Sequence, residues 1–356
     1  MSMQPFEKLS YRGKTRRLRQ LAMNALLCYP MEVASVHLIE AFTNANYRVK
    51  TRDGDSYFIR VCEPDWRTDL DLISEVAFLQ ALSCDGNFNT PLPIAAKTGD
   101  YIIEATAEGV PEPRRCMVMS WLPGVRMGLR LTEENLHNMG LLFARLHEWS
   151  LQFVPPPSFT RHRVDNPYHR GRSEILFDDH FLPAFHPGAR DVFKATMANV
   201  NEAYESLYAD LNGLRVIHND LHHDNIKVCR GILYPLDFED TCWGFPVQDI
   251  ATAFRDLMED TAQDTYPALR AAFRQGYESI GSWPEQYPHQ IDTFAAGILI
   301  EGVNRTAYDA PHELTAEISK LTPMLGKFLE NGVLEKVRLK AAERRRLATT
   351  LRIRKL

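Results

Sequence analysis

The sequence has none of the features of a membrane or secreted protein. Its 356 residues contain no apolar run close to the roughly 18 residues needed to cross a bilayer. The first 20 residues include basic side chains, but no apolar core and small-residue cleavage site follow them, as a secretory signal requires. The six cysteines include no Cys-x-x-Cys pair and mostly stand in apolar surroundings typical of free thiols. We therefore expect a cytoplasmic protein with no membrane partner.

Aromatic side chains are missing from the basic C-terminal tail, residues 341–356. Segments that bind single-stranded nucleic acid combine basic residues with aromatic ones, so this absence argues against a nucleic-acid partner. A basic tail can also bind an acidic membrane surface or the acidic body of a second subunit, which would make the protein a homodimer. The plainest interpretation is a solvated terminal helix, and the sequence leaves these alternatives open.

The composition is that of an ordinary soluble globular protein. Hydrophobic residues make up 45% of the chain and charged residues 24%. A chain of 356 residues is long enough for two lobes that each bury a substantial core. Composition therefore indicates a two-lobed globular protein but says little about its function.

The segment between His218 and Asp249 contains acids and an amide at the spacing that phosphoryl transfer requires. This reaction needs a carboxylate that accepts the proton of the acceptor hydroxyl, and oxygen ligands for the Mg²⁺ that neutralises the phosphates of ATP. Asp220 suits the catalytic role, and Asn225 and Asp237 suit the metal. The segment therefore predicts an ATP- and Mg²⁺-dependent enzyme.

Local structure is expected to bring these residues together. The apolar residues Leu214, Val216 and Ile217 predict a strand that runs into the catalytic loop. Residues 226–228 and 232–236 predict two short strands around a turn at Arg230-Gly231. Such a hairpin would return the second metal candidate to the side of the first. The alternative is a polar turn beside an ordinary hairpin, which the ordered set of features disfavours.

The same segment resembles the catalytic core of the aminoglycoside phosphotransferase and choline kinase-like superfamily. There, a His-x-Asp-x-x-x-x-Asn loop precedes an Ile/Leu-Asp-Phe-x-Asp motif and an Asp-Ile/Leu-Ala motif. The corresponding segments here are His218–Asn225, Leu236–Asp240 and Asp249–Ala251. More narrowly, the chain resembles the phosphotransferase enzyme family, which includes type II homoserine kinases and bacterial stress-response kinases. The resemblance implies a structural role for Asp249.

The resemblance also implies an α+β, two-lobed protein-kinase-like fold, with a small antiparallel-sheet lobe and a larger, mostly helical lobe. We expect a nucleotide-binding lobe with a leading helix at residues 1–120, a catalytic and substrate-binding lobe at 121–340, and the basic tail at 341–356. Glu239 departs from protein kinases, which have Gly at this position. That departure argues against an ordinary protein kinase and not against activity.

Hydrophobic periodicity supports this organisation. Helical spacing of apolar residues predicts helices at 14–28 and 70–83. Strands are predicted at 47–51, 57–62, 101–105 and 116–121, with Asp53-Gly54 as a hairpin signal between the first two. Farther along the chain we expect helices at 131–150 and 190–211, a long loop at 158–187, and mostly helix from 246 to 340.

A kinase-like site also needs a cation on the nucleotide phosphates, held by an acidic side chain on a nearby helix. Arg60 is the candidate cation, and Glu75 on the predicted helix 70–83 is the candidate partner. The family often has Lys at the first position, but Arg stays charged and can grip phosphate with two donors. The alternative is an exposed strand Arg near an exposed helix Glu.

No Gly-x-Gly-x-x-Gly loop is present to cover the phosphates. Asn44 and Asn46 occupy the turn before the predicted hairpin and resemble the Asn-rich nucleotide-positioning loop of the family. By the same resemblance, the segment from Met119 to Trp121 is the hinge that meets adenine. His147 also matches the family, and we interpret it as structural.

The predicted activity is transfer of the γ-phosphate of ATP to a hydroxyl of a small, amine-bearing molecule such as homoserine, an amino alcohol or an aminoglycoside. Asp240 and Glu301 are the candidates for contacting the amine. Two alternatives remain open at this point. One is a stress-response kinase that acts on protein Ser or Thr, and the other is a catalytically silent nucleotide-binding protein.

Overall fold

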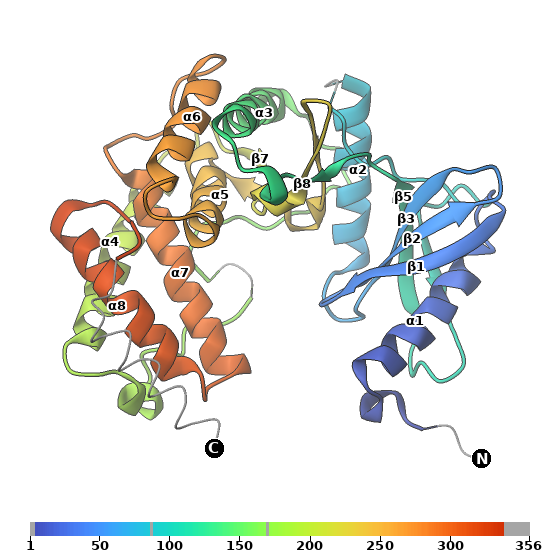
Figure 1. Ribbon diagram of the computed structural model, residues 1–356, viewed down its shortest axis with the longest axis horizontal. Helices are drawn as coiled ribbons and strands as arrows, with labels where there is room; N and C mark the ends of the chain where they lie inside the picture. Colours follow the sequence, from blue (N-terminus) through green and yellow to red (C-terminus); the bar gives the residue numbers. More distant parts are fainter. Residues whose placement is uncertain (1–3, 86–87, 169–170, 338–356) are drawn as a thin grey trace. The chain divides into compact units, whose positions relative to one another are not determined.

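The computed structural model describes residues 4–85, 88–168 and 171–337 (Figure 1). They form two compact units, each built from several segments. The first unit contains the described residues up to Val125 together with Val154–Arg161 and Lys227–Glu239. The second contains Arg126–Phe153, His162–Ile226 and the described residues from Asp240. The lobe limits at residues 120 and 340 stay predictions, and the tail at 341–356 lies outside the described residues.

A five-stranded antiparallel sheet forms the centre of the first unit, with strand order β1-β2-β3-β5-β4. Its strands are β1 (Val33–Ala41), β2 (Ala45–Thr51), β3 (Ser56–Val61), β4 (Ile102–Ala105) and β5 (Arg114–Ser120). The hairpin between β2 and β3 turns at Gly54, whose φ of 98° favours glycine. The four predicted strands and this turn are confirmed.

Strand β1 was not predicted from the sequence. Its exposure pattern does not alternate, because Leu38 and Ile39 are both partly exposed. Its register with β2 also shifts twice, between Val33 and Ser35 and between Leu38 and Glu40. Such irregularities interrupt the two-residue period by which a strand is recognised in a sequence.

Helix α1 (Tyr11–Leu26) packs on one face of this sheet (Figure 1). Ser10 begins the helix as an N-cap that accepts a hydrogen bond from the Gly13 backbone N–H. Leu21, Ala25 and Leu26 join sheet residues in a buried core. In the three central strands, every second residue belongs to this core: Tyr47, Val49, Ile59, Val61, Cys116 and Val118.

The opposite face of the sheet carries the functional candidates, because neighbouring residues of a strand point to opposite faces. Register places Asn46 opposite Arg60, and Arg60 opposite Met117. Two residues before Arg60 on the same strand, Phe58 lies opposite both Arg48 and Met119. Helix α2 (Asp69–Asp85), which carries Glu75, confirms the helix predicted at 70–83.

The second unit is mostly helical, which confirms the predicted α+β class. Its helices are α3 (Glu133–Gln152), α4 (Ala189–Tyr208), α5 (Pro246–Asp260), α6 (Tyr266–Glu278), α7 (Gln290–Asp309) and α8 (Leu314–Asn331). Strands β7 (Arg215–Ile217) and β10 (Cys242–Gly244) pair antiparallel within it. Within the loop predicted at 158–187, the described residues form one short 3-10 helix, at Asp179–Ala184. No helix among the described residues is long and apolar enough to cross a membrane.

The predicted hairpin that follows the catalytic loop is also present. It consists of β8 (Ile226–Cys229) and β9 (Ile232–Pro235), and β8 lies between β9 and β6 (Val125–Arg126) in a three-stranded sheet. Arg230 and Gly231 both have positive φ at its turn, as the sequence indicated.

Two glycines allow α3 and α6 to approach closely. A Cβ on Gly276 would overlap the backbone carbonyl of His137, and a Cβ on Gly140 would overlap the carbonyl of Phe273. These neighbours are backbone atoms and cannot rotate away. The contact therefore requires glycine on both helices.

We expect Gly276→Ala to destabilise the protein, because α6 must move away from α3 to accommodate the methyl group. Overpacking of this kind costs about 1–3 kcal/mol. Gly326→Ala in α8 is the matched control, since no atom lies within 4 Å of the added Cβ. It should stabilise its helix by about 0.5–1 kcal/mol. Urea unfolding measures both, and equal midpoints for Gly276→Ala and the wild type would refute the packing argument.

Candidate active site

The catalytic loop is held by the buried carboxylate of Asp249 in the first turn of α5. This carboxylate accepts hydrogen bonds from the backbone N–H groups of His218, at 3.2 Å, and Asn219, at 2.7 Å. The same carboxylate also contacts His147, whose Nε2 lies 3.1 Å from the Asp249 Oδ2. The Nδ1 of His147 lies 3.0 Å from the Tyr277 hydroxyl. All partners are satisfied when Nε2 donates to the carboxylate and the Tyr277 hydroxyl donates to Nδ1. The predicted structural roles of His147 and Asp249 are consistent with these contacts.

The last turn of the same helix holds the other end of the loop. The His223 Nε2 lies 3.0 Å from Oδ2 of Asp260, the final residue of α5. His223 is buried, whereas the Asp260 side chain is largely exposed. Helix α5 therefore positions the loop at both ends.

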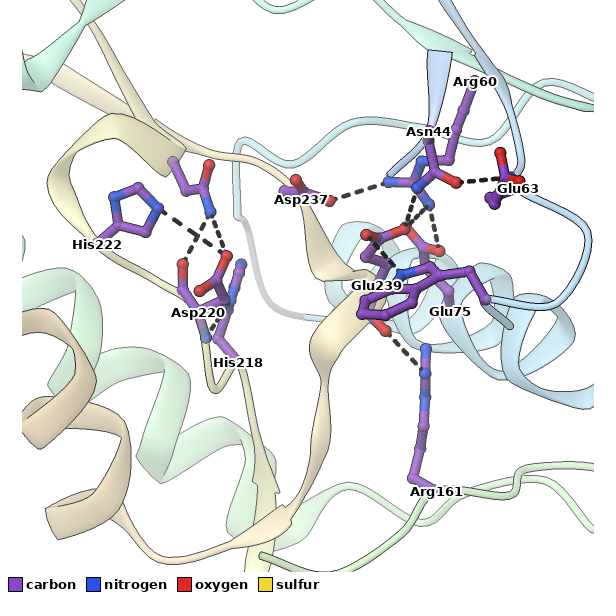
Figure 2. A network of polar contacts seen from close by, with 12 residues as sticks. Asn44, Arg60, Glu63, Glu75, Arg161, His218, Asp220, His222, Asp237 and Glu239 are labelled. Atoms are coloured by element: carbon purple, nitrogen blue, oxygen red, sulfur yellow. Dashed lines mark hydrogen bonds and ion pairs between the residues drawn. The ribbon is translucent and has the colours of Figure 1, made fainter. Parts of the chain in front are cut away.

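Asp220 follows a strained position in this loop. Asn219 has a φ of 64°, a left-handed conformation that Asn tolerates better than most residues. The Asn225 side-chain amide donates two hydrogen bonds of 2.9 Å, to the backbone oxygen and to Oδ2 of Asp220. Figure 2 shows these bonds beside His218 and His222. The structure thus brings the predicted base and one predicted metal ligand into direct contact.

His222 is kept neutral next to Asp220. Burial, followed by the nearby His223 and Arg255, lowers the pKa of His222 to about 3. Its Nδ1 accepts a hydrogen bond from the Asp224 backbone N–H, and its Nε2 lies 3.9 Å from the Asp220 Oδ2. Because His222 is neutral, it does not offset the negative charge of Asp220.

In the first unit, Arg60 is surrounded by three carboxylates (Figure 2). Its guanidinium lies 2.8 Å from Glu75, 3.1 Å from Asp237 and 3.4 Å from Glu239. Arg60 and Glu75 are both buried, so the alternative of an exposed pair is wrong. Burial opposes the charge of Arg60, but these carboxylates raise its pKa well above the ordinary value.

Glu239 has a larger part in this network than the sequence analysis assigned to it. Its Oε2 accepts a hydrogen bond of 2.7 Å from the Asn44 amide. The Asn44 side-chain oxygen in turn accepts from the Glu63 backbone N–H at 3.1 Å. The Glu239 backbone oxygen accepts from Arg161 at 3.0 Å. In the sequence, the position of Glu239 two residues after the metal candidate Asp237 is the feature that could have indicated this role.

Asn46 and Met119 lie on the sheet face that carries Arg60. The side-chain oxygen of Asn46 is buried and has no hydrogen-bond partner among the described residues. A buried acceptor without a partner is costly in a folded protein, so this atom is suited to a ligand. Met119 is buried opposite Phe58 and offers an apolar wall.

Trp121, in the predicted hinge, lies against two cations that the sequence analysis did not identify. The Arg48 guanidinium lies 4.3 Å from the centre of its ring, and the Lys227 ammonium lies 3.9 Å from it. The Lys227 ammonium also donates to the Leu122 backbone oxygen at 2.9 Å. Cation–π contacts of this kind fix the ring of Trp121 at the end of β5.

A pocket in the second unit opens beside the catalytic loop. Its wall includes Asn219, the residue before Asp220. Two facing helices supply most of the rest, each with residues at helical spacing. Helix α5 contributes Gln248, Thr252 and Arg255, and α7 contributes Phe294, Ile298, Glu301 and Arg305. Val164, Pro167 and Tyr204 complete the lining.

The lining of this pocket distinguishes between the two candidates for contacting the amine. Glu301 lines it, and its side chain is mostly buried. Asp240 is not among the described residues that line it. The sequence did not indicate the pocket-lining Arg255 and Arg305, because helical periodicity alone does not show which face of a helix borders a pocket.

The donor chemistry of Asn225 and Asp237 fits Mg²⁺. The Asn225 amide nitrogen is used in its bonds to Asp220, so its side-chain oxygen is the atom that would bind a metal. Asp237 is one of three carboxylates around the Arg60 guanidinium, and its side chain is 39% exposed, so a ligand can reach it. Among the described residues no three His, Cys, Asp or Glu side chains form a metal-binding group. Mg²⁺ commonly takes one or two carboxylates and completes its shell with phosphate oxygens and water.

The low pKa of His222 predicts a pH dependence of stability. In the unfolded chain the imidazole takes up a proton near pH 6.5, whereas in the folded protein it does so at about 3. The unfolded state therefore binds more protons in this window, and stability falls as pH falls from 6.5 towards 3.

The variant His222→Asn should flatten this dependence, because Asn does not titrate and its oxygen can still accept from Asp224. Urea unfolding at about pH 6.5 and about pH 4.5 should show that the wild type loses on the order of 2–3 kcal/mol more than the variant. Equal losses in both proteins would show that His222 is protonated in the folded state.

Comparison with known proteins identifies the fold and the family. The model of the phosphotransferase enzyme family matches residues 35–288. A homoserine kinase of Gluconobacter oxydans (strain 621H) is 25% identical over 279 residues, which cover 76% of this chain and 81% of the relative.

Solved structures agree on the fold. A microcompartment-associated aminopropanol kinase superposes with a TM-score of 0.71 at 17% identity, covering 89% of this chain and 99% of that one. An amicoumacin kinase in complex with AMP-PNP, Ca²⁺ and Ami superposes with a TM-score of 0.70 at 16% identity, covering 92% and 98%. The predicted kinase-like fold is therefore confirmed.

Proposed function

Because the chain belongs to the phosphotransferase enzyme family, we propose that it transfers the γ-phosphoryl group of ATP to a hydroxyl of a small, amine-bearing molecule. One observation carries this proposal. The catalytic loop, fixed at both ends by α5, places Asn219, the residue before Asp220, in the wall of a pocket that also contains the acidic side chain of Glu301.

Asp220 is the base of the proposed reaction. Its carboxylate accepts the proton of the acceptor hydroxyl while that oxygen forms a bond to the γ-phosphorus and the bond to ADP breaks. The two hydrogen bonds from Asn225 fix the orientation of the carboxylate. Neutral His222 adds no positive charge that would make this carboxylate a weaker base.

Arg60 and the two metal candidates would hold the nucleotide. Asn225 and Asp237 would bind Mg²⁺, which when present neutralises charge on the phosphates. Arg60, secured by Glu75, would contact the α- and β-phosphates, and Asn44 with Asn46 would position them. Met119 and Trp121 would contact the adenine. The AMP-PNP and Ca²⁺ bound by the structurally similar amicoumacin kinase support a nucleotide and a divalent cation as ligands.

Glu301 is the residue proposed to meet the amine. It is mostly buried in the pocket, and its partner there is Arg305, at 3.5 Å. The homoserine and aminopropanol named for two similar proteins both carry an amine and a hydroxyl. The pocket between two helices also argues against the alternative of a protein Ser or Thr acceptor, which would need a broad groove.

We expect Asp220→Asn to lower kcat by about 100-fold to 10,000-fold, because the amide cannot accept the hydroxyl proton. ADP release in the presence of Mg-ATP and an acceptor panel of amino alcohols, homoserine, choline and aminoglycosides measures the rate. Binding of Mg-ATP should persist in the variant, and calorimetry checks this. Full transfer by Asp220→Asn would remove Asp220 from the base role, and wild-type protein that binds no Mg-ATP would refute the proposed function.

Glu301→Gln should raise KM for amine-bearing acceptors by about tenfold or more, because a neutral amide no longer pairs with the ammonium. The kcat should fall much less, since the base and the nucleotide contacts remain. Glu278→Gln, at an exposed position of α6, is the matched control and should behave as the wild type. An unchanged KM in Glu301→Gln would place the amine elsewhere.

A further inference from the structure

The pocket beside the catalytic loop contains more positive than negative side chains. Arg255 and Arg305 line it together with the single acidic residue Glu301. An acceptor with only an amine and a hydroxyl would occupy Glu301 and leave Arg305 without its ion-pair partner. The charges of the wall therefore call for a negative group on the acceptor as well.

Arg255 has a donor that its own ion pairs do not use. It contacts Asp256 at 3.0 Å and Glu259 at 3.4 Å, and both contacts are made by Nη1. Its Nε is buried and has no hydrogen-bond partner among the described residues. A buried N–H without a partner is rare in native proteins and indicates a missing acceptor. A carboxylate in the pocket would supply that acceptor.

Arg305 and Glu301 form an ion pair that a ligand can replace. Their charged atoms lie 3.5 Å apart, and the Arg305 side chain is 45% exposed. Ion pairs this exposed contribute little to stability. A molecule that offers an ammonium to Glu301 and a carboxylate to Arg305 would exchange one weak pair for two. The adjacency of these side chains, one helical turn apart, matches two opposite charges on neighbouring atoms of the ligand.

We propose that the acceptor is a hydroxy amino acid whose ammonium binds Glu301 and whose carboxylate binds Arg255 and Arg305. This inference rests on the proposed function and specifies its substrate class. The hydroxyl of the same molecule would lie at the side of the pocket formed by Asn219, the residue before Asp220. Amino alcohols lack the group that both arginines recognise and are therefore poorer acceptors.

Matched sets of three compounds test the proposal. Homoserine becomes 3-aminopropan-1-ol when its carboxylate is removed and 4-hydroxybutanoate when its amine is removed. Serine, ethanolamine and 3-hydroxypropanoate form the same set for a shorter chain. Coupled release of ADP gives kcat/KM for each compound. The amino acid of at least one set should exceed both of its truncated forms by about tenfold or more, the usual effect of a charge-assisted hydrogen bond.

Two variants link this preference to the arginines. Arg305→Ala removes an exposed side chain, so it should fold normally, and Arg255→Gln keeps a polar group in the wall. Each should reduce the ratio of kcat/KM between the amino acid and the matching amino alcohol by about tenfold. Arg274→Ala, on the exposed side of α6, is the control and should leave the ratio unchanged.

The outcomes separate this inference from the proposed function. Amino alcohols or aminoglycosides that are phosphorylated as well as or better than the amino acids would overturn the inference and leave the kinase intact. A preference for the amino acid that neither arginine variant reduces would also overturn it. Failure of the proposed function is a different result, namely no binding of Mg-ATP and no ADP release with any acceptor.

Discussion

The catalytic half of the molecule depends on one buried carboxylate, that of Asp249. A carboxylate inside a protein is tolerated only when hydrogen bonds replace its water. Asp249 obtains them from the backbone of the catalytic loop and from His147. The cost of leaving this group without partners therefore forces the loop onto the start of α5. The same helix binds His223 at its other end and supplies one wall of the pocket, so one element positions both the proposed base and the proposed acceptor pocket.

Arg60 shows the opposite use of buried charge. Both carboxylate oxygens of Asp249 accept hydrogen bonds from the loop backbone or from His147. Arg60 has three carboxylates within 3.4 Å of its guanidinium, those of Glu75, Asp237 and Glu239. Hydrogen bonds like those of Asp249 hold a loop rigidly in place. The arrangement around Arg60 favours the arrival of a cation, because added positive charge at Asp237 and Glu239 relieves their mutual repulsion.

The sequence predicted those parts of the structure that depend on local spacing. The Asp53-Gly54 turn, the hairpin after the catalytic loop and the helix that carries Glu75 all follow from periodicity and turn chemistry. The contact between Arg60 and Glu75, which are fifteen residues apart, follows from a strand and a helix in succession. Strand β1 was missed because two register shifts disturb its alternation. Glu239 was treated as a family variant because its contact with Asn44 spans 195 residues.

The acceptor pocket lies at the limit of what a sequence can predict. Helix α7 is buried over much of its surface, so its periodicity does not mark Glu301 and Arg305 as neighbours of the catalytic loop. Only the packing of α7 against α5 brings them there. The residues proposed for the reaction thus lie in a short segment with strict spacing, while the proposed acceptor pocket is built from helix faces far apart in the chain. Substitutions on those faces would alter the wall of the pocket without removing the contacts that hold Asp220 and Asp249.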